Sequence, residues 1–193
     1  MDMGVVYGPY SVGKTYIAKE LQNRLTSNYV VYLLGRLANE SVHIRSIERG
    51  LDMPSGSFRT LEEALRRVFQ MSVDKHMMFI IDDYPALVDT APQVPILLRE
   101  LMETYRDYGK MFVLLMGTHV DELKGRILGE SSLIAPYIHS HFKVEPFTLD
   151  DVRALGWNYT DEDLAKLYYV TGGMPGNLVH IDPTASVDDN IVR

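Results

Sequence analysis

The chain carries, at residues 8–15, the stretch Gly8-Pro9-Tyr10-Ser11-Val12-Gly13-Lys14-Thr15. This stretch matches the pattern G-x-x-x-x-G-K-T, which is typical of a phosphate-binding loop, or P-loop. Its glycines let the backbone turn several N–H groups toward one phosphate. Lys14 is expected to carry a positive charge to the β- and γ-phosphates, and the Thr15 hydroxyl is expected to ligate Mg²⁺.

The residues on either side of the loop fit the same interpretation. Residues 3–7 are a short apolar run that predicts a buried strand. Residues 15–25 predict a helix, because Ile17, Ala18, Leu21 and Leu25 recur at a spacing of three to four. An ordinary glycine-rich turn is the alternative, and it explains neither flank. We therefore expect the whole loop, and Tyr16 after it, to bind nucleotide phosphates at a helix N-terminus.

The composition is that of a soluble globular protein with one sizeable core and room for a small subdomain. The 193 residues are 46% hydrophobic and 23% charged. The chain has no cysteine, which excludes disulfides and thiolate metal sites and fits the cytoplasm, where we expect it. No apolar run approaches the ~18 residues of a membrane span, and no signal peptide precedes the first strand. The net charge of −7 disfavours a broad nucleic-acid surface but leaves room for a local basic patch.

A second motif joins an apolar strand to two carboxylates. Residues 77–81 are apolar and lead directly into Asp82 and Asp83. A buried strand does not carry charge, so the acids must lie at its carboxyl end, where ligands bind in open α/β sheets. This is the Walker B pattern. We expect Asp82 to hold Mg²⁺, directly or through water, and Asp83 to orient or deprotonate the attacking water. The alternative is a strand followed by an acidic turn.

Strand and helix alternate through about residue 145, which predicts an α/β protein with a parallel sheet covered on both faces. Thr118 follows another apolar strand and is the candidate to touch the γ-phosphate or the attacking water. Two short helices are expected after residues 148 and 160, and no regular structure after residue 180. The other expected strands are 28–34, 111–116 and 138–144; the expected helices are 37–49, 60–71, 96–108 and 120–128; the expected loops are 50–59 and 84–95.

Several segments together resemble one family, the prokaryotic "archaeal ATPase" group in the AAA+/STAND branch of P-loop ATPases. They occur in the order of that family and extend over almost the whole chain. The Walker segments are common to many families, whereas the Asp-Tyr-Pro and Gly-Gly-x-Pro segments are more specific. The matching residues are Y-G-P-Y-S-V-G-K-T (7–15), I-I-D-D-Y-P-A-L-V (80–88), L-L-M-G-T-H (114–119), V-E-P-F-T-L-D-D-V (144–152), Y-V-T-G-G-M-P-G-N-L (169–178) and D-P-T-A-S-V-D-D-N-I (182–191).

The resemblance implies a three-layer P-loop NTPase fold with a mostly parallel five-stranded sheet and a small C-terminal helical lid. It implies that the strand before Thr118 lies between the P-loop strand and the Walker B strand, and that Thr118 is the sensor 1 residue. It also implies that Gly173 and Pro175 belong to the lid, near the base of ATP. The alternative for these residues is a helix C-cap followed by a turn. The expected division is an ATPase core over 1–146, a lid over 147–180 and a tail over 181–193.

Four departures from the family pattern bear on activity. The family often has Glu where this chain has Asp83, and the shorter acid reaches water less well. It often has a Gly-Arg pair before the fifth strand, where this chain has Pro136-Tyr137-Ile138, so an arginine that completes charge neutralisation is lacking there. The family usually begins upstream of the first strand and continues into a winged helix and a further domain. This chain begins at Met1 and ends at Arg193, the pattern of a fragment or a reduced form.

Three functions are consistent with these residues. The first is a slow Mg²⁺-dependent ATPase that binds ATP and ADP. The second is a nucleotide-controlled binding switch with little or no hydrolysis. The third is a small-molecule or nucleotide kinase with an acceptor pocket of basic side chains. The sequence identifies no protein or nucleic-acid partner, predicts no membrane association and leaves a homo-oligomer open. The arginines considered for the kinase pocket are Arg45, Arg49, Arg59, Arg66 and Arg67.

Overall fold

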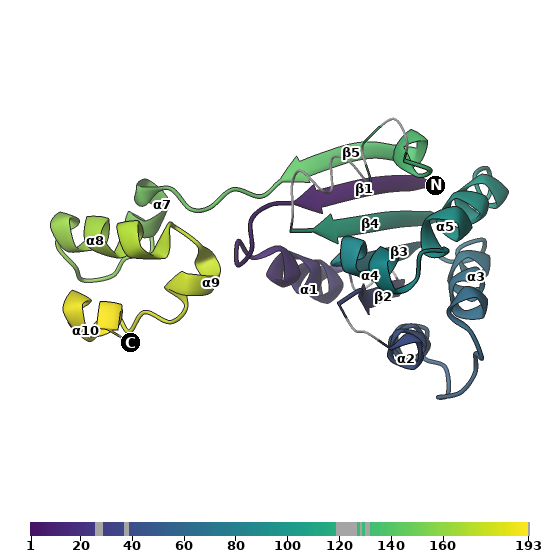
Figure 1. Ribbon diagram of the computed structural model, residues 1–193, viewed down its shortest axis with the longest axis horizontal. Helices are drawn as coiled ribbons and strands as arrows, with labels where there is room; N and C mark the ends of the chain where they lie inside the picture. Colours follow the sequence, from purple (N-terminus) through teal and green to yellow (C-terminus); the bar gives the residue numbers. More distant parts are fainter. Residues whose placement is uncertain (26–28, 37–38, 119–126, 128, 130–131, 193) are drawn as a thin grey trace.

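The fold is built on a sheet of five parallel strands in the order β2-β3-β4-β1-β5. A computed structural model of the protein describes residues 1–25, 29–36, 39–118, 127, 129 and 132–192. The strand β4 lies between β1 and β3, as the family resemblance implied, so the predicted α/β P-loop fold is confirmed (Figure 1). The strands are β1 (Asp2–Tyr7), β2 (Tyr29–Leu34), β3 (Met77–Asp82), β4 (Met111–Gly117) and β5 (Ile138–Lys143).

The apolar runs become strands because helices cover both faces of the sheet. Every residue of β3 is buried, down to Asp82 at its carboxyl end. Alternate side chains of a strand point to opposite faces. Phe79 and Ile81 therefore join one apolar cluster, and Met78 and Ile80 join the other.

The two faces are covered unequally. One is covered by α1 (Lys14–Arg24), which contributes Ala18 to its cluster. The other face packs against α2 (Glu40–Gly50), α3 (Leu61–Met71), α4 (Tyr84–Thr90) and α5 (Val94–Thr104). Helix α3 begins where its capping residue predicts, since the Thr60 hydroxyl accepts a hydrogen bond from the Glu63 N–H at 3.1 Å.

Residues 84–90 form a helix, so the prediction of a loop over 84–95 was wrong. Pro85 lies in the first turn of α4, where a missing N–H costs nothing because that group has no partner within a helix. The prediction of no regular structure after residue 180 was also wrong, because α10 spans Val187–Val192. The helix expected at 120–128 lies, apart from residue 127, outside the described residues.

The chain after β5 forms a separate helical cluster. It comprises α7 (Leu149–Arg153), α8 (Asp161–Thr171), α9 (Pro175–Leu178) and α10 around Val152, Leu164 and Leu178. Figure 1 shows the arrowheads of β1, β4 and β5 directed toward this cluster, so it lies beyond the carboxyl ends of the strands. A 3₁₀ turn, Ala135–Tyr137, precedes β5. No helix of the described residues is long and apolar enough to cross a bilayer.

Candidate functional site

A cavity of about 680 Å³ lies at the carboxyl end of the sheet, between the P-loop and the helical cluster. Its walls come from segments that are far apart in the sequence: the P-loop with the start of α1, the carboxyl ends of β2, β3 and β4, the connection after β5, the connection between α7 and α8, and α9. Most of the predicted site residues line it. These are Tyr10, Ser11, Val12, Gly13, Lys14, Thr15, Tyr16, Asp82, Thr118 and Pro175.

The P-loop leaves β1 and turns sharply into α1. Gly13 has a φ of 99°, a left-handed conformation that suits glycine, and it immediately precedes the first residue of the helix. Its carbonyl accepts the N–H of Ile17 at 3.0 Å, which starts the helical ladder. The unpaired N–H groups of the first helical turn therefore lie at the cavity wall, where an anion would be stabilised.

The Lys14 side chain lies along its own loop. Its Nζ donates hydrogen bonds to the carbonyls of Gly8, at 2.9 Å, and Pro9, at 2.7 Å. The two residues of the motif that do not line the cavity thus position the lysine. Burial lowers the pKa of Lys14, while the carboxylates of Asp82 and Asp83 act in the opposite direction.

Thr15 and Asp82 meet across the sheet-to-helix junction. The Thr15 hydroxyl donates to Oδ2 of Asp82 at 2.7 Å. The same oxygen accepts the hydroxyl of Tyr32, on the adjacent strand β2, also at 2.7 Å. Both distances are typical of a hydroxyl bonded to a carboxylate. The two residues predicted to hold a metal are therefore in direct contact.

Asp83 lies beside this centre rather than on the cavity wall. It has φ and ψ of 58° and 50°, in the left-handed region, and it immediately precedes α4. Its Oδ2 forms an ion pair with Nε of Arg36 at 2.8 Å. Arg36 follows β2 and does line the cavity, and its guanidinium lies 5.8 Å from the ring centroid of Tyr10.

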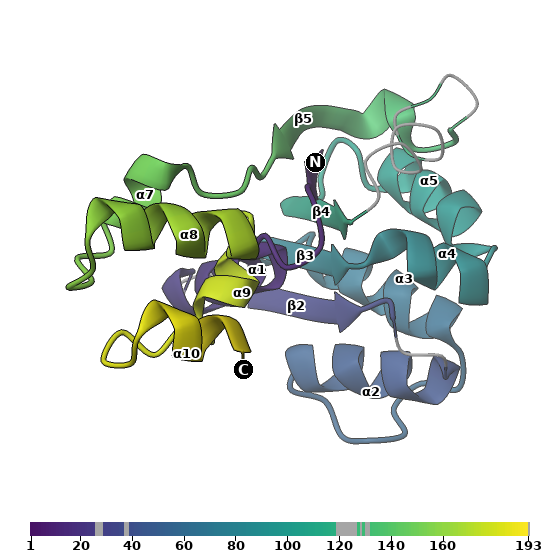
Figure 2. The same ribbon diagram turned by 60° about the vertical axis from the view of Figure 1, so that its left-hand side comes forward.

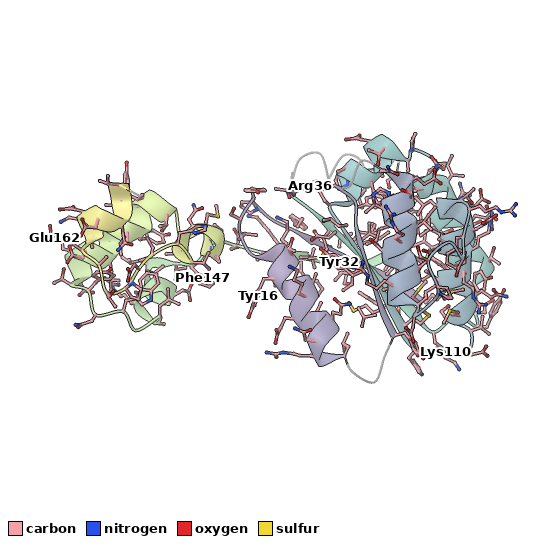
Figure 3. All side chains as sticks on the ribbon, turned by 90° about the horizontal axis from the view of Figure 1, so that it is seen from below. Tyr16, Tyr32, Arg36, Lys110, Phe147 and Glu162 are labelled. Carbon is pink, nitrogen blue, oxygen red and sulfur yellow. The ribbon has the colours of Figure 1, made fainter. Side chains whose placement is uncertain are left out.

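The helical cluster contacts the P-loop directly. The Gly176 N–H of α9 donates to the Ser11 carbonyl at 2.8 Å, and a Cβ on Gly176 would lie 2.8 Å from the Ser11 Cβ. Figure 2 shows α9 beside the start of α1. Phe147 and Trp157 give this side of the cavity an aromatic wall. Figure 3 shows Phe147 at the helical cluster, across from Tyr16 on α1.

Sequence reasoning missed several residues of this site. Arg36 and Tyr32 lie on or just after β2, a strand with no motif of its own. A signal existed, because Arg36 is the first charged residue after an apolar strand and the carboxyl ends of parallel strands meet at one edge. The segment Pro136-Tyr137-Ile138 does not line the cavity, and the Tyr137 hydroxyl donates to Glu103 at 2.6 Å instead. His119, beside Thr118, lies outside the described residues.

Comparison with solved structures shows the same fold in archaeal proteins. The Aeropyrum pernix ORC2 protein, in its ADPNP–ADP complexes, superposes with a TM-score of 0.68 at 13% identity over 93% of this chain. A Walker-type ATPase of Pyrococcus abyssi superposes with a TM-score of 0.64 at 16% identity over 92% of the chain. This chain covers 54% and 61% of those two proteins.

Sequence comparison gives a relative and a family. An uncharacterized protein of Methanocaldococcus jannaschii, MJECL04, is 22% identical over 172 residues, which are 89% of this chain and 37% of that protein. A sequence model of the family described as "ATPase family associated with various cellular activities (AAA)" matches residues 5–136, from β1 to the turn before β5. That match includes the P-loop, both acids and Thr118, and it covers well over half of the chain. The protein therefore belongs to the AAA family of ATPases.

Proposed function

We propose that this chain is a Mg²⁺-dependent ATPase that hydrolyses ATP slowly by in-line attack of water on the γ-phosphate. The observation that supports it most is the contact between Thr15 and Asp82, 2.7 Å apart at the mouth of the P-loop. That contact joins the phosphate-binding loop to the Walker B strand in one centre. Family membership supplies nucleotide binding; hydrolysis and its mechanism are the proposal.

The oxygen atoms of Thr15 and Asp82 are suitable ligands for Mg²⁺, which prefers oxygen and keeps several of its bound waters. A hydroxyl has one proton and two lone pairs, so the Thr15 hydroxyl that donates to Asp82 keeps both lone pairs for a cation. The Asp82 carboxylate supplies negative charge beside it. When bound, Mg²⁺ would neutralise charge on the β- and γ-phosphates.

The chain's own residues would share the remaining work. The amides of the P-loop and Nζ of Lys14 would hold the phosphates. Asp83 would accept a hydrogen bond from the attacking water, and Thr118 would touch the γ-phosphate or that water. Tyr16, Phe147 and Trp157, with Pro175, would contact the nucleoside on the aromatic side of the cavity. Arg36 would add a second positive charge near the phosphates.

The test is phosphate release from ATP, with nucleotide binding measured in parallel. We expect Lys14→Ala and Asp83→Asn each to lower turnover about a hundredfold. Lys14→Ala should also weaken ATP binding, whereas Asp83→Asn should leave it nearly unchanged. Lys19→Ala, on the exposed side of α1, is the matched control and should behave as wild type. Unchanged release in both site variants would refute the proposal.

A binding switch with little hydrolysis is the second candidate. The ion pair between Arg36 and Asp83 favours it, because an acid held by a guanidinium is less available to water. Calorimetry that shows micromolar ATP binding without turnover would support the switch over the ATPase.

A kinase has less support. None of the arginines proposed for an acceptor pocket lines the cavity, and Arg66, for example, pairs with Glu62 and Glu100. We further propose that residues 1–146 are the catalytic core, residues 147–180 a lid and residues 181–193 a C-terminal tail. A protein or nucleic-acid partner, a homo-oligomer and a cytoplasmic location stay predictions from the sequence.

A further inference from the structure

We infer that Tyr32 is a positioning residue for the divalent cation, acting through the Asp82 carboxylate. The inference rests on the proposed function. No motif includes Tyr32, and it does not line the cavity. Its hydroxyl nevertheless donates to the oxygen of Asp82 that also accepts the Thr15 hydroxyl, at the same distance of 2.7 Å.

Strand register explains how Tyr32 reaches this carboxylate. In the parallel pairing of β2 with β3, Tyr32 lies opposite Ile80, two residues before Asp82. Residues two apart on a strand share a face, so Tyr32, Ile80 and Asp82 all belong to the face covered by α1. The Tyr32 ring packs against the apolar cluster of that face, and its hydroxyl extends to the end of the neighbouring strand.

Because Asp82 is buried, the hydrogen bond from Tyr32 has a strong influence on the orientation of its carboxylate. Asp82 is only 4% exposed, so protein donors rather than bulk water must stabilise its charge and fix its orientation. The terminal torsion of an aspartate is broad and is not fixed by its own rotamer preference. Thr15 alone would hold one oxygen from one side, whereas Tyr32 adds a second donor from β2. With both donors in place, the carboxylate and the Thr15 hydroxyl keep the relative orientation that a shared cation requires.

Loss of the Tyr32 hydroxyl should affect the affinity for Mg²⁺ more than the affinity for the nucleotide itself. Groups that orient metal ligands without touching the metal change metal affinity, typically by 10- to 100-fold when removed. The P-loop amides and Lys14 do not depend on Tyr32, so binding of the phosphates without a cation should not change. We therefore expect loss of the Tyr32 hydroxyl to weaken the Mg²⁺-dependent part of nucleotide binding alone.

The experiment uses Tyr32→Phe, which keeps the ring in its apolar contacts and removes only the hydroxyl. Binding of the non-hydrolysable analogue ADPNP is measured by calorimetry in EDTA and across a series of Mg²⁺ concentrations. We expect the Mg²⁺ concentration for half-maximal tightening to rise about tenfold, with affinity in EDTA unchanged. Tyr29→Phe is the matched control: it lies at the other end of β2, with its ring centroid 3.9 Å from Nζ of Lys75, and should leave both values unchanged.

A double-mutant cycle with Asp82→Asn tests the route of the effect. If Tyr32 acts through Asp82, Tyr32→Phe changes the Mg²⁺ requirement in the wild-type background and not in the Asp82→Asn background. An unchanged Mg²⁺ requirement, an equal loss of affinity in EDTA, or fully additive effects would each overturn the inference while leaving the proposed function intact. Wild-type protein that binds ADPNP equally with and without Mg²⁺ would overturn both.

Discussion

Nε of Arg36 lies 2.8 Å from Oδ2 of Asp83, so the acid expected to orient water is paired with a cation from the end of the neighbouring strand. The Arg36 side chain is 56% exposed, and a pair this open to solvent contributes at most about 1 kcal/mol. Its importance therefore lies in what Asp83 can do rather than in stability.

Arg36→Gln should release Asp83 and raise kcat by about two- to fivefold, since the pair that competes with water is worth at most about 1 kcal/mol. The KM for ATP should rise, because a positive charge is removed from the cavity wall. Steady-state phosphate release measures both constants. Arg24→Gln, which breaks the exposed pair with Glu20 on α1, should change neither. A tenfold fall in kcat would instead indicate that Arg36 acts on the phosphates during the reaction.

Thr118→Val should lower kcat by about tenfold with little change in ATP affinity, if the hydroxyl touches the water or the γ-phosphate chiefly in the transition state. Valine keeps the shape of threonine and removes the hydroxyl. Thr90→Val, on the exposed side of α4, provides the comparison. Single-turnover phosphate release separates the chemical step from binding. An affinity loss as large as the loss of rate would mean that Thr118 serves ground-state binding.

Gly176→Ala should separate α9 from the P-loop. The new Cβ would lie 2.8 Å from the Ser11 Cβ, closer than side chains tolerate, and 3.0 Å from the Ser11 carbonyl oxygen, which is also a tight contact. We expect the N–H···O bond to Ser11 to break and nucleotide affinity to fall about tenfold, the equivalent of one hydrogen bond in a closed site. Fluorescence of Trp157, the sole tryptophan, reports the change at the cavity wall. Asp188→Ala, exposed on α10, should leave affinity as in wild type.

Asn190→Ala should loosen the C-terminal helix. The Asn190 side chain donates to the Tyr159 hydroxyl at 3.1 Å and to the carbonyls of Asp182 and Ser186 at 3.0 Å, and it accepts the Asp182 N–H at 2.8 Å. Its removal deletes these four partly buried hydrogen bonds, at a cost of about 2 kcal/mol. Amide hydrogen exchange should speed up in residues 181–192 and not in β3. Asn190→Asp should be at least as destabilising, because an anion would face the carbonyl oxygens of Asp182 and Ser186.

The features of the site that could be predicted are those specified by residues adjacent in the sequence. The P-loop could be predicted because a few adjacent residues specify its geometry. Asp82 and Asp83 could be placed at a strand end because an apolar run changes abruptly to two acids. Their flanking strand and helix follow from periodicity, and the place of β4 between β1 and β3 followed from the family resemblance. Tyr84 to Thr90 was misjudged because prolines were interpreted as loop residues, although a first-turn proline suits a helix.

The residues that could not be predicted belong to the site only through distant pairing. Tyr32 reaches Asp82 because β2 pairs with β3 in one register; a shift of one residue would place the ring on the other face. Arg36 meets Asp83 for the same reason. Trp157 lines the cavity because the helical cluster folds back over the P-loop, and neither spacing nor composition encodes that approach.

The order of the strands also has a consequence for biosynthesis. β1 is translated long before its two neighbours in the sheet, which are β4, where Asp2 pairs with Phe112, and β5, where Met3 pairs with Ile138. Until those later segments have been translated, the nascent P-loop strand has both edges open, and such long-range pairing is slow and exposed to aggregation. A ribosome stalled before Met111 is translated would therefore present an unpaired β1, which a chaperone or a neighbouring nascent chain could capture.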